Sequence, residues 1–261
     1  MVAFAFYGDP QTTIHQERGY FEGIKANIDA VSSLYNSSSS WSVRLYHDIS
    51  PKNPLMVDLC NLACSNDRLD LCHVDHLPHP LFADAVHMFP MIWRFFPTLD
   101  PQVDVFVSRD LDSVVTPREV KAVEEWLQSG KTLHAMRDHP QHTRVPMLGG
   151  LWGVQRTRSR KAWIDVWTDI WTAIIADPLS QNDRGKKGSD QELLRCHVWR
   201  RLSGEVFQHD SYSCAQYPGA MGFPSQRPNS TANFVGAKMD LGQRNIECPA
   251  HCRRKPSWTF C

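Results

Sequence analysis

The chain has 261 residues, of which 42% are apolar and 21% are charged. These values are typical of a folded protein with the length of one large α/β domain, and they exclude a mainly disordered chain. Lysine plus arginine and aspartate plus glutamate number 28 each, so no net charge attracts nucleic acid or an anionic membrane, and neither is expected as a partner.

The first part of the chain alternates between strand and helix patterns, which is typical of a sheet covered by helices. Apolar residues at helical spacing predict a helix from about Tyr20 to Tyr35. The apolar and aromatic stretch Ala83–Phe96 predicts a buried helix that Pro90 kinks or splits. The other elements predicted here are strands at Val2–Tyr7, Val43–Tyr46 and Leu69–Val74 and a short helix at Pro54–Ala63.

A strand followed by a helix is marked most clearly in the middle of the chain. The run Val103–Val107 is rich in β-branched residues and predicts the strand. Thr116 offers a capping hydroxyl, Pro117 suits the first helical position and Glu119 completes a capping box, so a helix is predicted from there to about residue 128. Residues 108–113 are thereby placed in the loop that leaves the carboxyl end of a strand, where open α/β sheets bind ligands.

The second half is less regular. The predicted helix Ser159–Ala176 carries a tryptophan every fourth residue, which is typical of a buried stripe rather than a sugar-stacking surface. A second capping box, Ser189–Glu192, predicts a helix that runs to about Arg200. The extended segments predicted in this half are Thr132–Met136, Gly149–Val154, Gly204–Gln208 and Asn233–Val235.

Asp110 and Asp112 lie one residue apart in the loop after the predicted central strand. Two such carboxylates can turn toward one hard divalent cation, which in turn binds phosphate oxygens. An Asp-x-Asp pair also arises by chance in charged loops, but the strand before it and the capped helix after it favour a site for Mn²⁺ or Mg²⁺.

Four segments resemble GT-A glycosyltransferases, in particular uncharacterised members that are distantly similar to the group of glycogenin and bacterial galactosyltransferases. The resemblance spans roughly Val2 to Lys238. It implies a single Rossmann-like GT-A domain with a mostly parallel sheet, in which residues 1–115 bind the nucleotide and 116–240 hold the sugar and acceptor, followed by a cysteine-rich tail at 241–261. The four segments are Trp93–Phe96, Phe106–Ser113, Met136–Pro140 and Leu148–Gly153.

The resemblance implies a metal-dependent transferase that moves a sugar from a nucleotide-sugar donor to an acceptor that the residues do not identify. Arg94 matches an arginine that helps to bind the donor, and Gly149–Gly150 matches a turn that lines the sugar site. Asp190 and Gln191 match an Asp-Gln pair beside the donor sugar. The remaining residues assigned to the donor site are Tyr7, Gly8 and Arg109.

The third metal ligand departs from the pattern of the distant group, which supplies it from a His-x-x-Gly segment. This chain has Asn233–Gly236 there; Asn233 could offer a carbonyl oxygen, and His209 or Asp210 could take over the role. The Asp-Gln pair implies a reaction that retains configuration. If the reaction inverts it instead, Asp138 or Asp190 would serve as the general base.

Several candidates also have a purely structural interpretation. Asp190 suits the first turn of a helix through the helix dipole alone, and Arg94 could pair with a core carboxylate. Asp138, before His139 and Pro140, could belong to a turn, and Gly149–Gly150 could shape a bend. Three short basic clusters are interpreted as solvated surface, with a phosphate contact as the alternative: Arg156–Arg160, Arg184–Lys187 and Arg253–Lys255.

Two other functions stay open. The strand that leads into Asp110 and Asp112 also resembles the first motif of haloacid-dehalogenase-like phosphatases, where Asp110 would be the nucleophile and Asp112 the acid and base. That motif normally opens its domain, and no convincing downstream acidic pair with a lysine follows here. Because Asn233 stands where a metal ligand is expected, a sugar- or nucleotide-binding pseudoenzyme is the non-enzymatic alternative.

Two features indicate different compartments. Met1 leads into an apolar strand without a signal-peptide pattern, and no apolar run is long enough to span a bilayer, which predicts a cytoplasmic protein. Eight cysteines and glycosylation sequons at Asn36 and Asn229 favour the Golgi or endoplasmic reticulum lumen, or secretion, with a leader missing. A loosely spaced zinc site at Cys60–His73 is an alternative for the first cysteines. The cysteines expected to form disulfides are Cys60, Cys64, Cys72, Cys248, Cys252 and Cys261.

Overall fold

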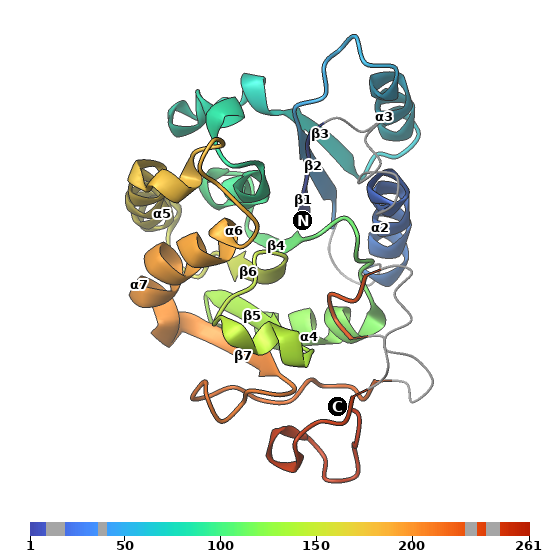
Figure 1. Ribbon diagram of the computed structural model, residues 1–261, viewed down its shortest axis with the longest axis vertical. Helices are drawn as coiled ribbons and strands as arrows, with labels where there is room; N and C mark the ends of the chain where they lie inside the picture. The colour runs from blue at the N-terminus through green and yellow to red at the C-terminus, as the bar shows by residue number, and fades with distance from the viewer. Residues whose placement is uncertain (9–18, 36–40, 228–233, 239–245) are drawn as a thin grey trace.

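The computed structural model of the chain describes residues 1–8, 19–35, 41–227, 234–238 and 246–261. Its centre is a seven-stranded sheet in the order β3-β2-β1-β4-β6-β5-β7 (Figure 1). Six of these strands run in one direction, and β6 alone runs antiparallel to both of its neighbours. The strands are β1 (Val2–Phe6), β2 (Val43–His47), β3 (Leu69–His73), β4 (Val105–Arg109), β5 (Leu133–Arg137), β6 (Leu151–Gln155) and β7 (Val206–Asp210).

Helices cover both faces of the sheet, which confirms the predicted α/β class (Figure 1). Because side chains alternate along a strand, Val2 and Phe4 of β1 pack with the apolar stripes of α2 and α4, whereas Ala3 packs on the opposite face with α5. The helices are α2 (Tyr20–Leu34), α3 (Leu55–Cys64), α4 (Pro117–Gln128), α5 (Arg160–Ala176), α6 (Ser189–Leu193) and α7 (Arg200–Leu202).

The segment before β4 differs from its prediction. In place of one α-helix over Ala83–Phe96, the chain forms two 3-10 helices, Ala85–His87 and Pro90–Leu99. Prolines 90 and 97 lack the N–H that an α-helix needs, so tighter turns replace it. The second 3-10 helix is buried along nearly its whole length and packs against β1, β4 and α5.

The two predicted capping boxes have different outcomes. At α4 the Thr116 hydroxyl accepts a hydrogen bond from the Glu119 amide at 3.3 Å, as expected, and the helix has the predicted bounds. At α6 the capping residue is instead Gly188 with φ 96°, and the Ser189 hydroxyl accepts a hydrogen bond from the Lys186 amide. The helix continues from α6 through a π-helical stretch, Leu194–Trp199, into α7.

The disulfides connect the last part of the chain rather than its first cysteines. Cys214 pairs with Cys252, and Cys248 pairs with Cys261, which confirms the stapled tail but adds Cys214 to it. Correcting the expectation from sequence, the structure leaves Cys60, Cys64, Cys72 and Cys196 as free thiols. Both sequons, at Asn36 and Asn229, lie outside the described residues. Among the helices that the structure describes, none combines the length and apolarity needed to cross a membrane.

Candidate functional site

The Asp110–Asp112 loop follows β4 at the carboxyl edge of the sheet. β4 extends two residues further than the sequence predicted, so Asp110 comes directly after the last strand residue, Arg109. The Arg109 side chain is buried, where it lies 3.2 Å from the Glu119 carboxylate and donates to the Ser113 hydroxyl at 2.9 Å. Arg109 therefore stabilises the loop from the protein interior. Contrary to the expectation, its side chain does not line the candidate cavity for the sugar donor.

Arg94 connects two of the predicted site carboxylates. From the 3-10 helix Pro90–Leu99, its guanidinium donates to Asp110 Oδ1 and, at 2.8 Å, to Asp190 Oδ2. Three segments far apart in the sequence thus meet at one point. The structure brings together the arginine, the first aspartate of the Asp-x-Asp pair and the aspartate of the Asp-Gln pair.

The pKa values of the Asp190 and Asp110 carboxyl groups are shifted in opposite directions. Burial raises the pKa of Asp190, and the positive charge of Arg94 only partly opposes this shift. Burial also acts on Asp110, but there the charge and hydrogen bonds of Arg94 outweigh it and lower the pKa. Asp190 Oδ1 is buried and has no side-chain or backbone hydrogen-bond partner of normal geometry within the described part of the chain, and Asp190 itself lies behind the cavity-lining residues Arg94 and Gln191.

Two glycines allow this cluster to pack so closely. A Cβ atom at Gly149 would lie 1.8 Å from Asp190 Oδ2 and 2.7 Å from an Arg94 nitrogen, and one at Gly150 would lie 2.3 Å from Asp110 Oδ2. Because β6 is antiparallel to β4, its first residue, Leu151, pairs with the last residue of β4, and the glycines before it reach the carboxylates. The Gly149–Gly150 turn therefore lies against the cluster.

A cavity of about 290 Å³ opens beside these residues. It combines positive charge and aromatic rings with the aspartates, a composition that suits a negatively charged ligand with a sugar. Burial raises the pKa of Tyr7 in its wall to about 12, so the Tyr7 hydroxyl is a hydrogen-bond donor at neutral pH. The lining residues are Ala5, Phe6, Tyr7, Tyr20, Met91, Arg94, Asp110, Leu111, Asp112, Lys187, Gln191 and Lys238.

Three polar residues of this lining were missed by the sequence analysis. Tyr20 begins α2 and carried no signal of its own. Lys187 belongs to a basic cluster that was interpreted as solvated surface, although a phosphate contact was the stated alternative. Lys238 lies two residues after the Gly236 of the segment searched for a metal ligand, and its ammonium is 3.1 Å from Asp112 Oδ2. For the two lysines, the only available signal was a basic residue close to the Asp190–Gln191 pair or to the Asn233–Gly236 segment.

The donor set fits a hard divalent cation in part. Asp110 and Asp112 line the same cavity, and carboxylate oxygens are the ligands that Mn²⁺ and Mg²⁺ prefer. Asn233, expected as the third ligand, lies outside the described residues. In the described part of the chain, the one group of three metal-binding side chains is Cys214, His251 and Cys252, and its two cysteines form a disulfide.

Other predicted residues lie elsewhere. His209 is on β7, three strands or roughly 14 Å from β4, and its ring nitrogens contact His134 at 2.8 Å and Glu125 at 3.0 Å. The structure does not bring His209 to the carboxylates, which corrects its expected role. Asp210, the other replacement considered for the third ligand, pairs with Arg137 in the core.

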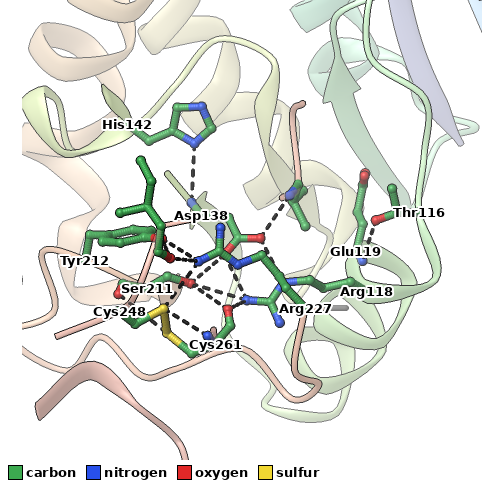
Figure 2. A network of polar contacts seen from close by, with 12 residues as sticks. Thr116, Arg118, Glu119, Asp138, His142, Ser211, Tyr212, Arg227, Cys248 and Cys261 are labelled. Carbon is green, nitrogen blue, oxygen red and sulfur yellow. Dashed lines mark hydrogen bonds and ion pairs between the residues drawn. A yellow bond between two sulfur atoms is a disulfide. The ribbon is translucent and has the colours of Figure 1, made fainter. Parts of the chain in front are cut away.

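Asp138 is also separate from the cluster, and a general-base role does not fit its surroundings. Its two oxygens accept hydrogen bonds from the Arg118 guanidinium, both at 2.8 Å (Figure 2). The Ser211 hydroxyl and the Val235 amide complete its coordination. Gly8, expected at the donor, is exposed with φ 80°, and its backbone hydrogen-bonds to Asp48.

No protein-family model and no curated protein matches the chain. The solved structures that resemble it include a glycosyltransferase involved in the glycosylation of the major capsid of PBCV-1, which is 14% identical over 83% of this chain and 87% of that chain, with a TM-score of 0.43. The galactosyltransferase LgtC, in complex with donor and acceptor sugar analogs, is 15% identical over 80% of this chain and 73% of that chain, with a TM-score of 0.44. The mannosyltransferase PcManGT from Pyrobaculum calidifontis, in complex with GDP-Man and Mn²⁺, is 13% identical over 59% of this chain and 44% of that chain, with a TM-score of 0.38. All three are glycosyltransferases with low overall similarity to this chain.

Proposed function

We propose that this protein is a GT-A glycosyltransferase that takes a sugar from a nucleotide-diphosphate donor and binds that donor in the cavity beside Asp110. The observation that carries the proposal is that Arg94 and Asp110, bonded to each other, lie with Asp112 in the wall of one cavity, and that Arg94 also binds the buried Asp190 behind that wall. The positive charge of Arg94 lies between Asp110, a carboxylate suited to a cation, and Asp190, a buried carboxylate with one unpaired oxygen. This arrangement suits a ligand that is anionic at one end and rich in hydroxyls at the other.

The residues divide the work between the two ends of the donor. Lys187 and Lys238 line the cavity with positive charge that stabilises the leaving diphosphate. A Mn²⁺ or Mg²⁺ ion held by Asp110 and Asp112 supplies further positive charge to the same phosphate oxygens when bound. Asp190, which Arg94 links to the cavity wall, is the carboxylate assigned to the side of the transferred sugar.

The remaining residues position the carboxylates and offer polar groups to the sugar. Because Gly149 and Gly150 have no side chains, the Asp190 and Asp110 carboxylates pack directly against their backbone. Gln191 lines the cavity next to Asp190 and offers both a hydrogen-bond donor and an acceptor to the sugar.

The two disulfides support a protein that works in an oxidising compartment.

Binding of donor nucleotides tests the proposal directly. Thermal unfolding should be measured with UDP-hexoses and GDP-mannose, with and without Mn²⁺, because a ligand that binds only the folded state raises the melting temperature. A shift that requires both nucleotide-sugar and metal supports the proposal. Asp112→Asn should remove this shift and the turnover while leaving the unliganded melting temperature unchanged, whereas Asp165→Asn on the exposed face of α5 should preserve both.

The same preparation separates the alternatives. Trapping of Asp110 as an aspartyl-phosphate mimic with fluoroberyllate would favour the phosphatase and contradict the proposed transferase function. Slow metal-dependent hydrolysis of the donor without acceptor would exclude the pseudoenzyme. Full activity of Asp112→Asn would refute the role given to the Asp-x-Asp pair.

A further inference from the structure

A short turn at residues 234–237 leads into the candidate donor cavity, which Lys238 lines. The Ala237 amide donates to the Phe234 carbonyl at 3.0 Å, which closes a four-residue turn. Its third residue, Gly236, has φ 89°, a value that such a turn requires and that favours glycine. A Cβ atom at Gly236 would also lie 2.9 Å from a Leu151 methyl group.

Three independent contacts fix this turn to the body of the protein. The Phe234 ring stacks on His139 with ring centroids 4.4 Å apart. The Val235 side chain is fully buried in a small apolar cluster with Leu151. The Val235 amide donates to Asp138 Oδ2 at 2.9 Å.

Asp138 is itself held rigidly. Arg118 binds it through two parallel hydrogen bonds and also donates to the carbonyl of Cys261, which a disulfide joins to Cys248 (Figure 2). Burial alone would favour the neutral acid, but the charge and hydrogen bonds of Arg118 outweigh it and lower the pKa of Asp138. The bond from the Val235 amide therefore ends on a charged acceptor, which strengthens it.

The turn leads directly to Lys238, whose ammonium lies 3.1 Å from Asp112 Oδ2. Asp112 is one of the two carboxylates available to a divalent cation, and one carboxylate cannot bind an ammonium and a metal ion at the same place without cost. We propose, as an inference that rests on the proposed function, that Asp138 positions this turn so that Lys238 acts as a built-in cation that competes with the divalent ion for Asp112.

Mn²⁺ affinity tests this inference without any measurement of activity. Titrations followed by the electron paramagnetic resonance signal of free Mn²⁺ give the dissociation constant for each variant. Lys238→Met should tighten Mn²⁺ binding about tenfold, because it removes both a competing ion pair and a repulsive charge. Lys121→Met, on the exposed face of α4, makes the same change in net charge and should leave the dissociation constant unchanged.

A matched pair of variants tests the positioning role of Asp138 while leaving that buried charge in place. Val235→Pro removes the amide that donates to Asp138, and proline is well tolerated at the second position of a turn with glycine third. Val235→Ala keeps the amide and loses only packing. We expect Val235→Pro to tighten Mn²⁺ binding about threefold relative to Val235→Ala, because Lys238 is then held less firmly at Asp112.

The outcomes separate this inference from the proposed function. If Lys238→Met binds Mn²⁺ no more tightly than the wild type, or if the two Val235 variants are equal, the inference is overturned even when nucleotide-sugars bind. If the variants behave as expected but no nucleotide-sugar binds with or without Mn²⁺, the inference stands as a property of the cation site and the proposed function fails.

Discussion

Two groups of arginine-aspartate pairs lie at the same carboxyl edge of the sheet, and their carboxylates differ in what is left unpaired. Beside β4 and β6, Arg94 joins Asp110, in the wall of a cavity, to the buried Asp190 behind it, and Asp190 Oδ1 has no hydrogen-bond partner within the described residues. At the ends of β5 and β7, both oxygens of Asp138 and of Asp210 accept hydrogen bonds.

The number of unpaired oxygens distinguishes a carboxylate with capacity for a ligand from a structural one. A buried charge is costly unless it is fully coordinated, so a structural aspartate collects partners on every side. A carboxylate that lacks a partner on one side and faces a cavity keeps binding capacity for a ligand. By this criterion Asp138 belongs to the scaffold, whereas Asp190 keeps one unpaired oxygen directly behind the cavity-lining Arg94 and Gln191.

The largest expected effect is on the scaffold pair Arg137 and Asp210. Asp210→Ala leaves the Arg137 guanidinium buried without its counter-charge, so the free energy of unfolding should fall by about 3–5 kcal/mol. Denaturant titration measures this. Asp104→Ala, which breaks an exposed pair with Arg156, should cost less than about 1 kcal/mol. Equal losses in both variants would remove the distinction between buried and exposed pairs.

Asp190→Asn should reduce turnover and leave stability nearly unchanged, in contrast to Asp210→Ala. The amide keeps the shape of the side chain and Arg94 retains Asp110, so stability should change little, whereas turnover of the donor should fall about 100- to 1000-fold. Steady-state kinetics and thermal unfolding on the same sample test this. A variant that is fully active, or one that loses stability as Asp210→Ala does, would place Asp190 in the scaffold.

The glycines should respond at an intermediate level. Gly149→Ala places a methyl group where Asp190 Oδ2 now lies, so the carboxylate must shift, and donor affinity should fall about tenfold or more. Gly204→Ala is the matched control, since a Cβ atom there would meet nothing within 4 Å. Isothermal titration with the donor nucleotide compares the two. Unchanged affinity in Gly149→Ala would mean that the cluster is not part of the donor site.

The smallest effect is expected at Glu125, beside the scaffold. Hydrogen bonds from His209 and Arg254 lower the pKa of Glu125 to about 2 from an ordinary value of 4.5. A carboxyl group whose pKa is lower in the folded state stabilises that state at any pH above its pKa in the unfolded chain. This contribution is lost as the pH falls toward and through the pKa of the folded state. Glu125→Gln should therefore cost about 1 kcal/mol at pH 7, and the difference from wild type should shrink between pH 4.5 and pH 2. Unfolding curves across this range would contradict the assignment if the difference were constant.

Local signals made part of the fold predictable. The bounds of α4 follow from Thr116, Pro117 and Glu119, which act through the nearest turn of the chain. The class of the sheet follows from apolar strand patterns, although β4 was placed two residues early. The 3-10 helix around Arg94 was not predicted, because the pattern indicated only that Pro90 interrupts a helix, and Pro97 lies beyond the predicted range.

The candidate site could be predicted only where a motif carried it. Resemblance singled out Arg94, Asp110 and Asp190, and the structure joins them by hydrogen bonds. Asp138 and Asp190 could not be distinguished from sequence, because the partners that decide their roles lie 20 to 97 residues away. Lys238 was missed for the same reason, because its partner Asp112 is distant in the sequence.

The single reversed strand, β6, has a practical consequence for engineering. The residues before its amino end, Gly149 and Gly150, lie against the Asp110 and Asp190 carboxylates, so its carboxyl end, at Gln155, emerges beside Val105 on the opposite rim of the sheet. A peptide inserted into the connection at 156–159 would thus project away from the candidate cavity by the length of the strand. That rim is where we expect a tag or a fused domain to leave the candidate site undisturbed.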